Sequence, residues 1–241
     1  MNRRLLAAAA LGLLLVSAGC TGLGGGSGQV DRAKLAQNAT YDWNTTADVT
    51  FNVTGGYYHA VYRVDNRSSI ALARFHRLND RRPLPIEAVA FRYPNGTVVG
   101  AEAMNATQNR THVTVTFPAR HGEFAYRVAH RGKELRVVTA VQGSYEVVIP
   151  PATQVRYPLI GRVAPAGYRT SEEGGRVHVR WDQVTGDRID VRYYLVRDLW
   201  IFAGMLAAGA AAALVGLSYF WLQLRELRER RQTVDVERGG R

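Results

Sequence analysis

The stretch RVHVRWDQVTGDRIDVRYYLVRDLWIFAGMLAAGAAAALVGLSYFWL, residues 176–222, holds the two patterns that decide the architecture of the chain. At its start, Val177, Val179 and Trp181 alternate with charged or polar side chains. Such alternation is typical of a β-strand with one buried and one solvent-facing side. At its end, residues 199–222 contain no charged side chain. The stretch therefore predicts a β-rich domain that runs directly into an apolar helix.

The same alternation recurs elsewhere in the chain. Residues 49–53, 113–117 and 189–195 place apolar side chains at every second position, so we expect each strand to have one wet face. The dipeptides Asn95-Gly96 and Gly174-Gly175 are typical of hairpin turns between such runs. Short strands joined by regular turns predict an all-β fold that resembles a β-sandwich.

The β-rich domain is expected to occupy residues 31–198. Helical periodicity is missing between Tyr41 and Val196, whereas residues 31–37 can form one short helix. Pro150-Pro151 interrupts two strand-rich stretches, and proline cannot donate to a strand ladder. A subdivision near residue 150 stays open, because the pattern fits one sandwich or two smaller ones.

Residues 199–222 form the predicted transmembrane helix. These 24 residues give a helix of about 36 Å, which is long enough to cross a hydrocarbon core of about 30 Å. Aromatic rings favour the membrane interfaces, and they lie at both ends of the segment: Trp200, Tyr219, Phe220 and Trp221. Arginines follow at once and predict that residues 223–241 are a basic cytoplasmic tail: Arg225, Arg228, Arg230 and Arg231.

A stripe of small residues runs along the predicted helix. Gly204, Ala208, Ala212 and Gly216 recur every four residues, a pattern that lets two membrane helices pack closely. The partner would be a second copy of the chain or another membrane protein. The segment is rich in alanine, so such a stripe also arises by chance.

The first 19 residues have the order of an export signal. Arg3 and Arg4 precede an apolar run over residues 5–16, which is too short to span a bilayer. The two arginines also resemble a twin-arginine signal, so the sequence leaves the general secretory and twin-arginine routes open. We expect residues 1–19 to be cleaved and residues 20–30 to form a glycine-rich linker.

Cys20 is the single cysteine of the chain. The run Ser17-Ala18-Gly19-Cys20 resembles a bacterial or archaeal lipobox, although the pattern prefers an aliphatic residue at the position of Ser17. The resemblance implies a lipid-modified Cys20 at the start of the mature chain. The alternative is a free cysteine in an unlipidated signal. A single thiol excludes disulfide scaffolds and sites that need several cysteine ligands.

Seven of the eight asparagines beyond the signal are followed two residues later by serine or threonine, with no intervening proline. They are predicted N-glycosylation acceptors: Asn38, Asn44, Asn52, Asn66, Asn95, Asn105 and Asn109. No asparagine occurs from residue 110 to the end. We expect the first half of the domain to carry sugar and the bare second half to face the membrane or a protein partner.

Motifs of common catalytic and metal sites are missing. None of the six histidines forms a zinc-binding helical pair, and neither a nucleophile elbow nor a phosphate-binding glycine loop occurs. Asp182, Asp187 and Asp190 do not follow the calcium-loop pattern. We interpret these aspartates and Glu172-Glu173 as surface charge, and we expect no cofactor, no bound metal and no enzymatic activity.

The chain is strongly basic, with 31 Lys and Arg, 20 Asp and Glu, and a formal charge of +11. A basic exported domain attracts anionic lipid headgroups, an acidic surface coat or acidic glycans. Nucleic acid is a poor fit for an exported domain. Only Lys34 and Lys133 are lysines, so the excess is almost entirely arginine.

Several of these features together resemble an uncharacterised family of haloarchaeal cell-surface lipoproteins. The resemblance is carried by Cys20, by residues 41–46 (YDWNTT), by residues 92–99 (RYPNGTVV) and by the junction at residues 191–199. It implies a surface location with no assigned activity. The chain departs from that lineage in its charge, because such proteins are usually acidic.

The sequence favours a non-enzymatic, glycosylated cell-surface protein, held by a lipid and by a single-pass helix, with a structural or interaction role at the envelope. The alternative is a sensor or accessory subunit that passes extracellular binding to a membrane partner through its helix. A third option is an exported hydrolase, for which no catalytic motif was found.

Overall fold

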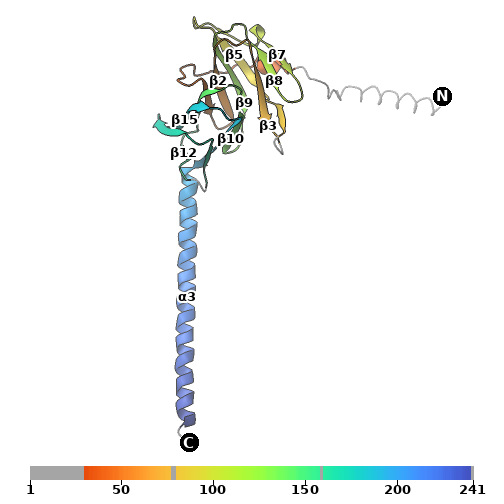
Figure 1. Cartoon of the computed structure of the whole chain (residues 1–241). Coiled ribbons are helices and arrows are strands. Elements are labelled where there is room, and N and C mark those ends of the chain that lie inside the picture. Colours follow the sequence, from red (N-terminus) through yellow and green to blue (C-terminus); the bar gives the residue numbers. More distant parts are fainter. Residues whose placement is uncertain (1–29, 77–79, 158–159, 240–241) are drawn as a thin grey trace, which may run out of the picture.

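The computed structural model describes residues 30–76, 80–157 and 160–239. The predicted signal peptide, Cys20 and nearly all of the linker lie outside these residues. The described chain is mostly β-strand, arranged in four sheets, and ends in one long helix, α3 (Figure 1). This architecture confirms the expectation of an all-β domain followed by an apolar helix.

The largest sheet has eight strands and forms one layer of the domain. All neighbouring strands pair antiparallel except β1 and β11, which pair parallel. Across the sheet the order is β14 (Arg169–Glu173), β15 (Arg176–Val184), β11 (Gly143–Val148), β1 (Val49–Val53), β2 (Tyr57–Val64), β9 (Gly122–Ala129), β5 (Glu87–Arg92) and β6 (Val98–Val99).

Two smaller sheets form the second layer. The four-stranded sheet contains β4 (Arg81–Pro83), β3 (Ser69–Phe75), β8 (Val113–Thr116) and β7 (Asn105–Gln108). The three-stranded sheet contains β10 (Glu134–Val138), β16 (Arg188–Arg192) and β13 (Arg162–Ala164). Buried side chains of both small sheets pack with those of the large sheet in one hydrophobic core, which makes the domain a sandwich.

Short elements complete the domain. The helix α2 (Arg32–Leu35) begins at Asp31, whose carboxylate accepts from the backbone of Ala33 and Lys34, and it confirms the expected short helix. A 3₁₀ turn, η2 (Ala101–Ala103), follows β6. The strands β12 (Thr153–Gln154) and β17 (Tyr194–Leu195) pair just before α3 begins.

The core follows the alternation of the sequence. Val49, Phe51 and Val53 are fully buried. The Phe51 ring lies edge-on to Tyr62 and stacks on Tyr145, with ring centres 6.1 and 6.3 Å away. Burying a side chain of this size stabilises the fold by about 1.5–3 kcal/mol, so the apolar face of β1 is a main contribution to the core.

The expectation of one wet face per strand is wrong for β1. Thr50 is only 8% exposed and Asn52 is half-buried, although both lie on the polar face of the strand. The irregular segment of residues 42–46 lines the same cavity as these two side chains. The segment therefore covers a sheet face that the alternation alone assigns to solvent.

Residues on both sides of Pro150-Pro151 belong to one sheet and one core. β11 ends at Val148, before the prolines, and pairs antiparallel with β15, which lies after them. Val147 and Val179 from these strands are fully buried in the shared core. The β-rich part of the described chain is therefore a single packed unit.

The two predicted turn dipeptides are confirmed. Gly174 and Gly175 connect β14 to β15 with φ of +57° and +71°, which glycine adopts without a steric penalty. Asn95-Gly96 lies between β5 and β6, and Gly96 has φ of +88°.

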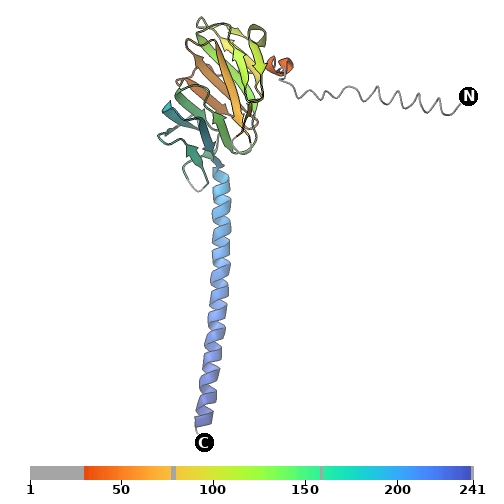
Figure 2. The ribbon, with the colours of Figure 1, turned by 45° about the vertical axis from the view of Figure 1, so that its right-hand side comes forward.

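The helix α3 (Val196–Gly239) starts at the residue after β17 and leaves the domain as a single rod (Figures 1 and 2). Its segment Val196–Arg225 is long and apolar enough to cross a membrane, and it is not buried against the domain. The predicted segment 199–222 lies within it. The helix extends from Val196 to Gly239. Beyond residue 222 it continues because Leu, Gln, Glu and Arg are good helix formers, so loss of hydrophobicity does not end the helix.

Candidate membrane-proximal site

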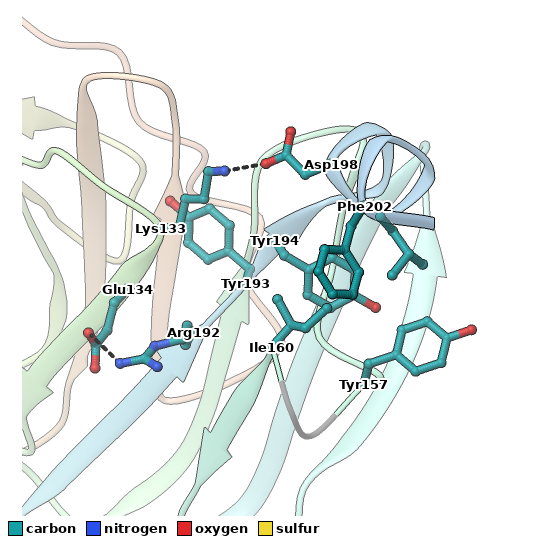
Figure 3. A pocket seen from close by; sticks show the side chains of 10 residues that line it. Lys133, Glu134, Tyr157, Ile160, Arg192, Tyr193, Tyr194, Asp198 and Phe202 are labelled. Atoms are coloured by element: carbon teal, nitrogen blue, oxygen red, sulfur yellow. Dashed lines mark hydrogen bonds and ion pairs between the residues drawn. The ribbon is translucent and has the colours of Figure 1, made fainter. Parts of the chain in front are cut away.

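An apolar groove lies where the β-domain meets the first turns of α3 (Figure 3). Its volume is about 820 Å³, and its walls are mainly the side chains of Tyr157, Ile160, Tyr193, Tyr194, Leu199 and Phe202. These residues come from the loop after β12, from β17 and the residue before it, and from α3. The groove therefore joins the domain to the apolar surface of the helix.

Tyr193, the residue before β17, is fixed by hydrogen bonds to the β9–β10 turn. The Tyr193 hydroxyl donates to the carbonyl oxygen of Gly132 at 3.0 Å, and the Tyr193 amide donates to the carbonyl of Lys133 at 2.9 Å. Tyr193 is 4% exposed, and burial raises the pKa of its hydroxyl. The hydroxyl is therefore a stable hydrogen-bond donor at neutral pH.

Two ion pairs form the polar border of the groove. Lys133 Nζ donates to Asp198 Oδ2 at 2.5 Å and so connects the β9–β10 turn to the first turn of α3. Arg192 Nη2 lies 3.4 Å from Glu134 Oε2, between β16 and β10. Figure 3 shows both pairs beside the apolar side chains. Because both pairs are partly exposed, they orient the elements more than they stabilise them.

Aromatic and aliphatic side chains of the groove are exposed to an unusual degree. Tyr157 is 55% exposed, Ile160 40% and Phe202 57%, and Trp200 on the adjacent turn of α3 is 74% exposed. The rings of Tyr157 and Tyr194 lie 6.1 Å apart. Contiguous exposed apolar surface of this kind marks a membrane or protein contact.

Arginines are neighbours of the groove residues in the chain or in the sheet. Arg162 and Arg192 are directly opposite each other on β13 and β16, and both are exposed. Arg156 and Arg197 are exposed as well and lie next to Tyr157 and Asp198 in the chain. Aromatic rings bordered by cations suit the headgroup region of an anionic bilayer.

The structure describes all seven predicted glycosylation asparagines. Six of them are exposed: Asn38, Asn44, Asn66, Asn95, Asn105 and Asn109. Asn52 differs, because it is half-buried in β1 and its Oδ1 is buried without a hydrogen-bond partner. Asn105 is the first residue of β7, and Figure 1 places β5, β7 and β8 at the end of the sandwich away from α3. Glycosylation itself stays a prediction.

The other predicted residues fall into two groups. Cys20 lies outside the described residues. Gly204, Ala208, Ala212 and Gly216 are all exposed on α3, with open space around both glycines. Packing through this stripe stays a prediction.

The acidic residues that the sequence assigns to surface charge do not meet. Asp182 pairs with Arg169, Asp187 with Arg81, and Asp190 with Arg136. Asp190 is buried rather than exposed, and burial raises the pKa of its carboxyl. Glu173 pairs with Arg180, while Glu172 is exposed. Within the described residues, no group of three or more His, Cys, Asp or Glu side chains is arranged to hold a metal ion.

Sequence reasoning missed the groove. Tyr157 and Ile160 lie in a loop some 40 residues before Leu199 and Phe202, so no local pattern joins them. The pair Tyr193-Tyr194, two aromatic residues directly before an apolar helix, was the available signal. Lys133 gave no signal, since only the fold brings it to Asp198.

No curated protein and no solved structure matches the chain. A family model described as a family of unknown function, DUF5803, matches residues 45–238. This match includes every strand of the sandwich and the apolar segment of α3. The chain therefore belongs to DUF5803, a family of unknown function.

Proposed function

We propose that the protein is a non-enzymatic, membrane-anchored cell-surface protein with a structural or interaction role at the envelope. Residues 31–198 would lie outside the cell, α3 would cross the membrane once, and residues 223–241 would lie in the cytoplasm. One observation carries the proposal: the sandwich continues without a linker into a helix whose apolar segment, Val196–Arg225, is not buried by the domain.

The exposed helix needs an apolar surrounding. A segment of 18 or more apolar residues is expected to insert into a bilayer, because water cannot solvate it favourably. The arginines after Leu222 favour the cytoplasmic side for the tail. A soluble bundle would bury one face of such a helix, whereas α3 is exposed at every position from residue 200 to residue 225.

The groove supports contact between the domain and the bilayer surface. Tyr157, Ile160 and Trp200 offer apolar area, and Arg156 and Arg197 offer positive charge at the same end of the domain. Anionic lipid headgroups would satisfy both. We expect the sandwich to rest on the membrane, with an acidic surface coat or glycan as a further binding partner.

Glycans on the opposite end would complete this arrangement. The exposed acceptors Asn95 and Asn105 lie in the turn after β5 and at the start of β7, and Figure 1 places β5 and β7 at the end of the sandwich away from α3. Glycopeptide mapping of protein from the native host tests this part. We expect sugar on several of the six exposed asparagines, and seven bare sites would contradict the proposal.

The topology can be tested with single cysteines. In a Cys20→Ser background, Thr107→Cys on exposed β7 should react with a membrane-impermeant maleimide on intact cells, whereas Thr233→Cys in the tail should react only after lysis. Labelling of Thr233→Cys on intact cells with protection of Thr107→Cys would overturn the proposed orientation. Equal labelling of both sites on intact cells would overturn the membrane crossing.

The rigid junction favours a second candidate, a sensor or accessory subunit. Lys133 and Asp198 connect the domain to α3, and β17 continues directly into the helix, so a movement of the domain would be passed to the helix. This function needs a membrane partner that receives the movement of α3. Crosslinking on intact cells, followed by identification of co-purifying proteins, separates the two: recovery of a specific membrane protein favours the sensor.

A further inference from the structure

A polar cavity lies on the outer face of the eight-stranded sheet, apart from the groove at α3. Its volume is about 290 Å³. The floor comes from four adjacent strands, β15, β11, β1 and β2, and the cover is the irregular segment of residues 42–46. A cavity of this size suits a small ligand rather than a polymer.

The sheet register places the floor residues in two neighbouring rows. Arg180, Glu146 and Thr50 are directly opposite one another on β15, β11 and β1. His178 and Asn52 belong to the next row, in which Asn52 is opposite His59 on β2. Residues two apart on a strand point to the same face, so these side chains share one surface.

Charged side chains around the buried Glu146 form one end of the cavity. Glu146 is 4% exposed, and its Oε1 accepts from His178 Nδ1 at 2.6 Å and from Arg180 Nε at 2.9 Å. Arg180 also donates to both carboxylate oxygens of Glu173, at 2.8 and 3.2 Å. The guanidinium is therefore occupied by two carboxylates and has little capacity to bind an anion.

Polar atoms without a partner lie beside this cluster. Thr50 Oγ1 and Asn52 Oδ1 are buried and have no hydrogen bond. Thr50 as a whole is more than nine-tenths buried, and both residues line the cavity. Burial and the charge of Arg127 lower the pKa of His59, so its neutral ring offers a further acceptor. Buried polar groups in folded proteins are normally paired, and unpaired ones call for an explanation.

The cover is held in place at its start. The Tyr41 hydroxyl donates to the carbonyl oxygen of Ala88, and Arg92 Nη2 donates to the carbonyl of Trp43 at 3.1 Å. The Arg92 guanidinium also lies over the Trp43 ring, 5.4 Å from its centre. Residues 44–46 follow this anchor and belong to no helix or strand, so a ligand can enter by a shift of this short segment alone.

We propose that this cavity binds a small organic cation through an ammonium group that donates hydrogen bonds to Thr50, Asn52 and Glu146. Asn52 Oδ1 can only accept and Thr50 Oγ1 can also accept, so a ligand that donates satisfies both atoms. Three carboxylates line the cavity, those of Asp42, Glu146 and Glu173, against one occupied arginine. An anion would meet negative charge without a free cation. The inference goes beyond the proposed function and does not depend on membrane topology.

The test uses the full-length protein in detergent, with methylammonium and 1,4-diaminobutane as probes. Tetramethylammonium is the matched control, because it carries the same charge without an N–H donor, and glucose is the neutral donor control. We expect saturable binding by calorimetry and a raised Tm with the two amines. Equal effects from tetramethylammonium would indicate ionic screening, and equal effects from glucose would remove the need for charge; either result overturns the proposal.

A variant then locates the site. Thr50→Val preserves the shape of the side chain and removes the unpaired hydroxyl, so its Tm without ligand should be unchanged or higher. Its affinity for methylammonium should fall about tenfold, the effect of one lost charge-assisted hydrogen bond. Thr107→Val on exposed β7 is the matched control and should bind like the wild type. A folded Thr50→Val protein with unchanged affinity would overturn the assignment of the amine to this cavity.

Discussion

The two halves of the β-rich domain differ in what they present to their surroundings. The first half, residues 31–109, carries all seven acceptor asparagines, whereas the second half, residues 110–198, carries none and supplies the strands β10, β12 and β17 next to α3. Yet β1 of the first half pairs with β11 of the second inside one sheet. The comparison shows that the two halves of the chain can differ in their surface chemistry although they share one hydrophobic core.

The largest expected effect is on membrane attachment. It should show that α3 is a stronger anchor than a lipid at Cys20. Deleting residues 199–241 should release part of the protein from membranes, because one lipid at Cys20 would give only weak and reversible binding. Cys20→Ser should release almost none, because α3 stays inserted. Membrane fractionation after a salt wash measures both. A deletion variant that stays wholly bound, or a soluble serine variant, would reverse the ranking of the anchors.

The shared core predicts that the halves unfold together. Phe51→Ala removes a fully buried ring that contacts Tyr62 of the first half and Tyr145 of the second, so the free energy of unfolding should fall by about 3–5 kcal/mol. Urea unfolding followed by tryptophan fluorescence should show a single transition. Val98→Ala, at a half-exposed site, is the control and should cost less than about 0.5 kcal/mol. Two separate transitions would show that the two halves unfold independently.

Asp48 tests the parallel contact between the halves. Its Oδ2 accepts from the backbone amide and the hydroxyl of Ser144, at 2.9 and 2.7 Å, and these bonds hold the pKa of the Asp48 carboxyl below its usual value. Asp48→Asn should therefore lower the free energy of unfolding by about 1–2 kcal/mol at pH 7. The side chain is 40% exposed, which places the expected loss at the lower end of this range.

The sign of the pH dependence follows from the lowered pKa. The ionised carboxylate contributes its stability above the unfolded pKa of about 3.9, and this contribution is lost as the pH falls through the lower folded value. The difference in the free energy of unfolding between wild type and Asp48→Asn should thus be constant at neutral pH and become smaller below about pH 4. Asp182→Asn, in an exposed pair with Arg169, should change little at any pH. A difference that grows in acid would be incompatible with this role of Asp48.

The smallest effect concerns the junction with α3. Lys133→Met removes the ion pair with Asp198, which is partly exposed, so the free energy of unfolding should change by less than about 1 kcal/mol. The orientation of the domain should loosen instead, and distances between spin labels on the domain and on α3 should broaden. Arg169→Met breaks a more exposed ion pair, between β14 and β15, and should leave those distances unchanged. A narrow distribution in Lys133→Met would show that β17 alone fixes the junction.

Local sequence patterns predicted the individual strands, turns and helix. The pairing of strands that lie far apart in the sequence could not be predicted from such patterns. The alternation of Val49, Phe51 and Val53 predicts a strand, and Gly174-Gly175 predicts a turn. Both predictions were possible because these elements depend on neighbouring residues. The parallel pairing of β1 with β11 joins residues more than 90 positions apart, and no local pattern specifies it. The long apolar helix was predictable for the same local reason, since 24 uncharged residues are contiguous.

The candidate sites show the same limit. Thr50 and Asn52 looked like the solvent side of a strand, because alternation reports which residues avoid the core and not what covers them. The cover formed by residues 42–46 and the opposing Glu146 become visible only in the fold. The family match confirms an uncharacterised family, whereas the haloarchaeal source and the lipid at Cys20 stay predictions.

Because β17 continues directly into α3, the orientation of the domain is coupled to the orientation of the helix. No linker separates Leu195 from Val196, so the sandwich turns with the helix when α3 rotates about its own axis. In the proposed single-pass topology this rotation sets the direction in which the sandwich points around the membrane normal. An α-helix turns by about 100° for each residue, so one residue inserted after Asp198 would swing the whole domain by more than a quarter circle. If α3 crosses the bilayer as proposed, a neighbour that fixes this rotation would determine which face of the sandwich each adjacent molecule meets.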